Sequence, residues 1–149
     1  MSIRSILVPL DGASDNQAIL ENALKVARTF SAHVEALHVR PDARDAIPLF
    51  GEGLSGDMVE EMINSAERES EEKSTALQAV FNDVCAQQNV SQAETPGVED
   101  TSTLDHVTAR WSEQIGREDD VVAWRGRLSD LVVGARPDAD SSPMRALTL

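Results

Sequence analysis

Two short, uninterrupted apolar runs, one near each end of the chain, constrain the fold more than any other feature. They are Ile6-Leu7-Val8 and Leu131-Val132-Val133, and each is followed closely by turn residues. A short apolar run without alternation is typical of a strand that is buried on both faces. Such strands belong to parallel sheets with helices on both sides. Because aromatic residues make up only 3% of the chain, we expect Val, Ile, Leu and Ala to build the core.

Between these runs, the patterns of strands and helices alternate. Alternation of this kind predicts an α/β fold: a three-layer open parallel sheet with right-handed crossovers. Residues 91–103, which include Pro96-Gly97, have the composition of a loop, and Ser142-Pro143 has the signature of a further helix start. The expected strands are residues 3–10, 33–39, 107–115 and 131–133, and the expected helices run from 14 or 15 to 30, from 57 to 88 and from 118 to about 128.

The apolar positions of each expected helix predict the face that it buries. We expect the third helix to bury Val121, Trp124 and Leu128, and we expect Trp111 to be a core or interface residue. The second helix has an almost wholly polar middle, residues 67–73, which favours a solvated stretch. The first two helices carry their apolar positions at Ile19, Ala23, Val26, Ala27 and Phe30, and at Met58, Met62, Ala66, Leu77, Val80, Phe81 and Val84.

Charge and cysteine content exclude several classes of protein. The chain has 13 basic and 26 acidic residues in 149, a net charge of −13, which opposes binding to a nucleic-acid backbone. The single cysteine, Cys85, cannot form an intramolecular disulfide, which favours a reducing compartment. The N-terminus lacks the pattern of a secretory signal, and no apolar run is long enough to cross a membrane. We therefore expect a cytoplasmic protein without a membrane partner.

Three segments together resemble the universal stress protein family. Residues Ser5-Ile6-Leu7-Val8-Pro9-Leu10-Asp11-Gly12 are similar to the first strand of that family and the acidic residue after it. Ala36-Leu37-His38-Val39 is similar to its second strand, and Ser129-Asp130-Leu131-Val132-Val133-Gly134 to its fourth. The resemblance extends from about Ile3 to Arg136.

The resemblance implies an adenine-nucleotide alpha-hydrolase-like sheet with strand order 3-2-1-4-5. In such a sheet ligands bind beyond the carboxyl ends of the strands, where the order reverses between the first and fourth strands. Asp11 is a hydrogen-bonding partner for a ligand's ribose or base, or it only caps the turn. Gly134 permits close approach of a ligand to the backbone, or it only allows a tight turn at the end of the strand. The candidate cofactor-binding residues are Asp11, Gly12, Ala13, Gly134 and Arg136, the last as a cation for an anionic group or as the partner of a surface carboxylate.

Two departures from the family pattern change what is expected of this chain. Nucleotide-binding members have a second glycine three residues after the one at Gly134, where this chain has Pro137, and a later Gly-Ser or Gly-Thr pair that is absent here. Asp138 and Asp140 add negative charge at the same place. We therefore expect no cofactor, with ATP and Mg as the alternative.

The second departure is the end of the chain. The last helix and fifth strand of the family pattern are missing, so we expect residues 1–149 to form a single domain that is incomplete at its C-terminus. The partner would be a second copy in a homo-oligomer or a second domain of a longer chain. If the chain is complete, its fourth strand is an exposed edge, which favours pairing with another chain.

The sequence indicates a binding module rather than an enzyme. Ser14 lacks the Gly-x-Ser-x-Gly frame, the third strand lacks the aspartate of a receiver domain, and no Walker loop is present. His33, His38 and His106 lack metal-ligand spacing, so we expect no metal. The main hypothesis is a stress-response regulatory module that acts by self-association or partner binding, with weak or lost nucleotide affinity. The alternatives are an ATP-binding switch with slow hydrolysis and, third, a flavodoxin-like electron carrier.

Overall fold

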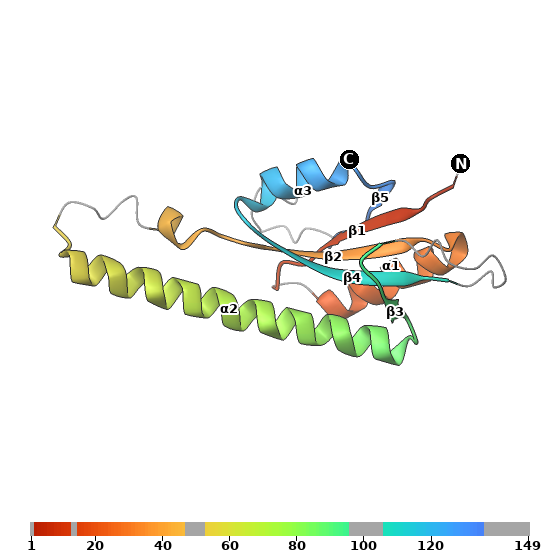
Figure 1. Ribbon diagram of the computed structural model, residues 1–149, viewed down its shortest axis with the longest axis horizontal. Coiled ribbons are helices and arrows are strands. Elements are labelled where there is room, and N and C mark those ends of the chain that lie inside the picture. Colours follow the sequence, from red (N-terminus) through yellow and green to blue (C-terminus); the bar gives the residue numbers. More distant parts are fainter. Residues whose placement is uncertain (1, 13–14, 47–52, 96–105, 136–149) are drawn as a thin grey trace.

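The protein is an α/β domain in which helices cover both faces of one parallel sheet (Figure 1). The computed structural model describes residues 2–12, 15–46, 53–95 and 106–135. The strands are β1 (Ser5–Pro9), β2 (His33–Arg40), β3 (Ser91–Gln92), β4 (Thr108–Ile115) and β5 (Leu131–Val132). The helices are α1 (Asn16–Phe30), α2 (Gly56–Gln87) and α3 (Glu118–Gly126), with a short 3-10 helix η1 (Ala43–Ala46).

The sheet has the order β3-β4-β2-β1-β5, and every pair is parallel. The four expected strands correspond to β1, β2, β4 and β5, so the predicted order 3-2-1-4 is confirmed. At the reversal of strand order, Leu7 is the register partner of Val132, and the N–H of Val133 donates to the carbonyl oxygen of Leu7 at 2.9 Å. The two apolar runs from opposite ends of the chain therefore lie side by side, β1 inside the described sheet and β5 at its edge. The expectation that both runs are buried on both faces holds for β1 and is wrong for β5, where Val132 is 44% exposed.

β3 corrects the expectation that residues 91–103 form only a loop. Ser91 and Gln92 pair with Thr108 and Ala109 of β4. Both β3 side chains are exposed, and two residues are too few to show a periodicity, so no local pattern indicates this strand. The predicted helix at Ser142 and the expected absence of a last helix and strand concern residues 136–149, which lie outside the described residues.

The core lies mainly between the sheet and the two helices α1 and α2. Ile6 and Val8 of β1, Leu24 of α1 and Phe81 of α2 are all at most 2% exposed and belong to one apolar cluster. On the opposite face a smaller cluster, made by Leu7, Leu37, Val39 and Val122, packs α3 against the sheet.

α1 begins and ends where local chemistry predicts. The side chain of Asp15 accepts a hydrogen bond from the N–H of Ala18 at 3.1 Å, which satisfies a free donor of the first turn. Ser31 adopts a left-handed conformation (φ 52°) and ends the helix. Of the predicted apolar face, Ala23 and Ala27 are fully buried, but Phe30 is 40% exposed because it lies at the helix end.

α2 has a buried half and an uncovered half. Its buried residues all lie in the second half: Ser74, Leu77, Phe81, Val84 and Cys85. Met58 and Met62, predicted on the apolar side, are 52% and 41% exposed, because the first half of the helix extends beyond the sheet (Figure 1). The polar middle is not simply solvated, since Arg40 of β2 donates to the Ser70 hydroxyl at 3.0 Å and lies 3.8 Å from the Glu71 carboxylate.

The two tryptophans have different environments. The ring of Trp111 packs against the core, with its centroid 6.0 Å from that of Phe81 and 6.2 Å from that of His38. The expected buried face of α3 holds for Val121, which packs against the smaller apolar cluster, and is wrong for Trp124 and Leu128, which are 54% and 70% exposed. The residue of α3 that is buried is Val122. No helix among the described residues is long and apolar enough to cross a membrane.

Candidate ligand-binding site

A pocket of about 600 Å³ lies where the chain leaves the carboxyl ends of β1, β2 and β4. Asp11, Pro41 and Gly116 follow these three strands and line the pocket, and α2 and the first turn of α3 form the facing walls. A volume of this size is typical of a small-molecule site. The walls carry five carboxylates, two cations, two further polar side chains and three apolar ones: Asp11, Asp45, Glu69, Glu118 and Asp119; Lys73 and Arg117; His38 and Ser70; Val39, Pro41 and Ala66.

The charge on the pocket wall is predominantly negative. One of the two cations, Arg117, donates to Asp119 at 3.0 Å and lies 3.8 Å from Asp120. The hydrogen bond from Arg117 lowers the pKa of Asp119, so this carboxylate stays ionised at neutral pH. Five carboxylates share this wall with two cations, so its net charge is negative, which attracts cations and repels anions.

His38, one of the residues that line the pocket, is almost fully buried and has one ring nitrogen without a partner among the described residues. Its side chain is 3% exposed, and Nδ1 lies 3.0 Å from the carbonyl oxygen of Leu10. Because a carbonyl only accepts, the geometry assigns the proton to Nδ1 and leaves a lone pair on Nε2. Nε2 is buried and has no hydrogen-bond partner among the described residues. One ring nitrogen of His38 therefore has a hydrogen-bond partner among the described residues and the other does not.

The turn after β1 passes directly beneath Lys73. Gly12 has φ 74°, in the left-handed region that glycine adopts without strain, and a Cβ there would lie 2.5 Å from Cε of Lys73. The glycine thus lets the lysine side chain of α2 lie close to this turn. This contact joins a residue expected at the site, Gly12, to one that the sequence did not single out.

The structure brings together only part of the predicted site. Asp11 lines the pocket and Gly12 lies beside it, but Ala13 and Arg136 are outside the described residues. Gly134 follows β5, is exposed, and does not line this pocket. The pocket is therefore displaced from the β1–β5 reversal toward β2, β4 and α2.

Sequence reasoning missed the residues that α2 and η1 supply. Glu69, Ser70 and Lys73 belong to the polar stretch that was assigned to solvent, and Asp45 to the connection after β2. The acidic start of α3, with Glu118 and Asp119, was likewise not predicted to lie at the site. Its position at the end of β4 was the available signal, since turns after parallel strands meet at one edge of the sheet.

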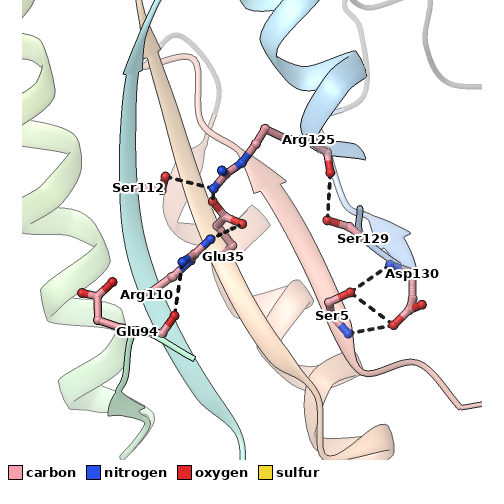
Figure 2. A network of polar contacts seen from close by, with 8 residues as sticks. All are labelled: Ser5, Glu35, Glu94, Arg110, Ser112, Arg125, Ser129 and Asp130. Carbon is pink, nitrogen blue, oxygen red and sulfur yellow. Dashed lines mark hydrogen bonds and ion pairs between the residues drawn. The ribbon is translucent and has the colours of Figure 1, made fainter. Parts of the chain in front are cut away.

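A second polar cluster lies on the α3 face of the sheet (Figure 2). The carboxylate of Glu35 on β2 accepts from Arg110 of β4 at 3.0 Å and from Arg125 of α3. Arg110 also donates to the Glu94 carbonyl at 3.2 Å, and Arg125 to the Ser112 hydroxyl at 3.4 Å. One carboxylate thus serves two guanidinium groups, and this shared contact fixes α3 to the sheet.

A third polar contact positions β5. The carboxylate of Asp130 accepts from the N–H groups of Arg4 and Ser5 at 2.8 and 3.0 Å, and from the Ser5 hydroxyl at 3.2 Å (Figure 2). These backbone hydrogen bonds lower the pKa of Asp130. Asp130, directly before the fourth expected strand, therefore holds β5 against β1, and we call its hydrogen bonds to Arg4 and Ser5 the β5 clamp.

The described residues offer no other reactive centre of the expected types. Cys85 is buried, and burial raises the pKa of its thiol to about 11, so little thiolate forms at neutral pH. Among the described residues, no three His, Cys, Asp or Glu side chains converge in a way that could hold a metal ion.

A parallel sheet in this order, covered by helices on both faces and with a pocket at the carboxyl ends of its central strands, defines an open-sheet α/β domain. The sequence model of the Universal stress protein family matches residues 2–134. The chain therefore belongs to the universal stress protein family, a family of stress-response domains, as its sequence resemblance indicated.

Two solved structures are similar to this chain, and the first of them supports the fold. The universal stress protein UspA from Lactobacillus plantarum is 18% identical, with a TM-score of 0.55, and the match covers 96% of this chain and 83% of that one. A universal stress protein from Archaeoglobus fulgidus is 14% identical, with a TM-score of 0.47, over 99% of this chain and 85% of that one. No curated protein matches the sequence.

Proposed function

We propose that this chain is a non-catalytic regulatory domain of the stress response, which acts by associating with itself or with a protein partner and binds nucleotide weakly or not at all. The observation that carries the proposal is the carboxylate-lined pocket at the strand ends. Asp11, Glu69 and Glu118 come from three different elements, so the negative charge surrounds the pocket.

ATP with Mg does not fit the residues present. Phosphate groups bind where backbone N–H groups and cations converge, and here Arg117 is paired with Asp119 while Lys73 is the other cation of the wall. A magnesium ion would offset part of the charge of the phosphates, but no group of metal-binding side chains converges among the described residues. In the sequence, Pro137 also lacks the N–H that a glycine would offer at that position.

An exposed apolar region supports association. Trp124, Leu128 and Val132 are 54%, 70% and 44% exposed, and they surround the junction of α3 with β5. β5 is also an edge strand within the described part of the sheet. Exposed apolar side chains beside an unpaired strand edge are typical of a surface that pairs with another chain.

The test measures nucleotide binding and association on the same preparation. With about 1 mM ATP and excess Mg, we expect the melting temperature to rise by less than about 2 °C. A Kd weaker than about 1 mM stabilises the folded state by less than about 0.4 kcal/mol at this concentration. Sedimentation velocity over a range of protein concentrations should give a mass above that of one chain. A large thermal shift with ATP, nucleotide retained through purification, and a monomer at all concentrations would contradict the proposal and favour the ATP-binding switch.

A further inference from the structure

We infer that the first half of α2 is a docking surface for a basic amphipathic helix of a partner protein. The surface is an apolar stripe on the helix, which we call the α2 stripe and which consists of Met58, Val59, Met62, Ile63 and Ala66. The inference rests on the proposed function in one respect, because it assumes that the chain acts by binding a protein. It goes further by assigning the surface and the chemistry of the partner.

The α2 stripe is a helix face that the domain does not bury. Its members recur at spacings of three and four residues, so they lie on one side of the helix. The same spacing continues along α2 to Ser74, Leu77 and Phe81, which are buried. None of the five stripe residues is buried, and none belongs to either apolar cluster of the described residues. The core-facing side of α2 therefore continues past the sheet (Figure 1).

The side chains of the α2 stripe suit a contact with another protein. Met58 and Met62 are both exposed, and Val59 and Ile63 beside them are partly exposed. Methionine is flexible and adapts to differently shaped apolar partners, so it is common at binding surfaces. Because a helix gains most of its stability from packing of its apolar face, a partner on the stripe would also stabilise this half of α2.

The shape of the surface fits another helix. The backbone of α2 is hydrogen-bonded within the helix, so it offers no strand edge to an extended peptide, and side chains must provide the contact. Helices pack through stripes of three- and four-residue spacing, and α1 already packs against α2 within the core. From Met58 to Ala66 the stripe is about 12 Å long, which about two turns of a partner helix would cover.

The charge around the stripe favours a basic partner. Residues 68–73 contain three acidic and two basic residues, whereas residues 56–67 contain no basic residue and four acidic ones: Asp57, Glu60, Glu61 and Glu67. A second copy of the stripe would bring the same negative charges together. Anionic lipid headgroups and nucleic-acid phosphates are repelled for the same reason. A helix with lysine or arginine beside an apolar stripe complements both the charge and the apolar surface.

The experiment titrates the full chain by calorimetry with a probe peptide of two Leu-Lys-Lys-Leu-Leu-Lys-Leu repeats. A second peptide, with glutamate in place of every lysine, keeps the apolar positions and reverses the charge. Vesicles of phosphatidylglycerol are titrated in parallel to test a membrane as the partner. The test variant combines Met58→Gln with Met62→Gln, and the matched control combines Met58→Leu with Met62→Leu. Circular dichroism spectra and melting curves verify that both variants are folded.

We expect the lysine peptide to bind the wild type. The glutamine variant should weaken its affinity by about tenfold or more, because apolar contacts with the peptide are lost. The leucine variant should stay within about threefold of the wild type, because it keeps an apolar side chain of similar size. The ¹³C methyl resonances of Met58 and Met62 should shift with the lysine peptide and should not shift with the glutamate peptide.

A second pair of variants tests the charge. Glu60→Lys reverses a charge beside the stripe, and Asp83→Lys makes the same change of charge at an exposed position in the covered half of α2. These positions are about 35 Å apart along the helix, which is well beyond the screening length at physiological salt. We expect Glu60→Lys to weaken binding of the lysine peptide by about threefold or more, and Asp83→Lys to change it by less than about 1.5-fold.

The outcomes separate this inference from the proposed function. Equal affinity of the glutamine variant and the wild type, or equal binding of the two peptides, overturns the inference. Equal weakening by Glu60→Lys and Asp83→Lys also overturns it, because binding is then a general response to the net charge of −13. Binding of the vesicles without binding of the lysine peptide would overturn it in favour of a membrane.

The nucleotide and sedimentation measurements complete the separation. If the lysine peptide does not bind, while the chain associates with itself and does not bind ATP, the inference fails and the proposed function stands. If ATP binds tightly, and neither the peptide nor a second copy of the chain binds, both fail.

Discussion

The two faces of the sheet are held to their helices by different forces. On the face covered by α1 and α2, a continuous apolar layer includes Phe81 and Leu24, both almost fully buried. On the face covered by α3, four apolar residues are buried, and the charged contact of Glu35 with Arg110 and Arg125 lies beside them.

This difference separates the stability of the domain from the placement of its pocket. Apolar burial is strong but non-directional, so the α1–α2 face accounts for most of the folding free energy without fixing fine positions. Hydrogen-bonded ion pairs are directional. The contact of Arg125 with Glu35 therefore fixes the position of α3 on the sheet. It thereby also fixes the position of Glu118 and Asp119 in the pocket wall.

The largest expected effect is on the apolar face. Phe81→Ala removes a ring that is 1% exposed and packs against Trp111, so we expect the free energy of unfolding to fall by about 3–5 kcal/mol. Val122→Ala, on the α3 face, should cost about 2 kcal/mol or less. Urea denaturation measures both, and equal losses would show that the two faces contribute alike.

A smaller loss of stability is expected when Glu35, whose carboxylate contacts both Arg110 and Arg125, is changed. Glu35→Gln keeps the shape of the side chain but leaves Arg110 and Arg125 without their counter-charge. We expect a loss of about 2 kcal/mol, below that of a fully buried pair, because these side chains are partly exposed. The exposed control Glu61→Gln should lie within about 0.5 kcal/mol of the wild type. If Glu35→Gln matched that control, the charged contact would not hold α3.

The smallest effect is expected at the β5 clamp and depends on pH. Folding lowers the pKa of Asp130 below its ordinary value of 3.8, through hydrogen bonds from the backbone of Arg4 and Ser5. The ionised form is therefore favoured in the folded state, and its contribution is present above pH 3.8 and is lost as pH falls through the lowered value. Asp130→Asn removes this contribution.

Urea midpoints of the wild type and Asp130→Asn, measured from pH 7 down to pH 3, check this prediction. The wild type should be the more stable at pH 7, and the gap should narrow at acidic pH. A gap that is the same at every pH would mean that ionisation of Asp130 is irrelevant to the clamp.

Most of the sheet was predictable because its signals are local. The apolar runs and the alternation of strands with helices predicted a parallel sheet, and the resemblance to the universal stress protein family implied its strand order. The buried face of α3 was not predictable, because a helix of nine residues with apolar and charged residues on several sides does not define one stripe. Val122 is buried there, and the apolar Trp124 two residues later is not.

The pocket was only partly predictable, because its walls come from distant segments. Asp11 and Gly12 follow a recognisable strand, so the sequence placed them at the strand ends. Glu69 and Lys73 reach the pocket only because α2 passes that edge of the sheet, and no local pattern of charges records where a helix will pass. The lone pair of His38 depends equally on a tertiary contact, the hydrogen bond to Leu10.

Only the second half of α2 packs against the core, and this affects how the domain unfolds locally. A helix of 32 residues is about 48 Å long, and its buried side chains begin only at Ser74. The covered end can melt only together with the sheet, whereas the end near Ser55 can unwind without breaking the core. Glu69 and Ser70 lie just beyond the covered end, so such unwinding would dismantle one wall of the pocket while the rest of the domain stayed folded.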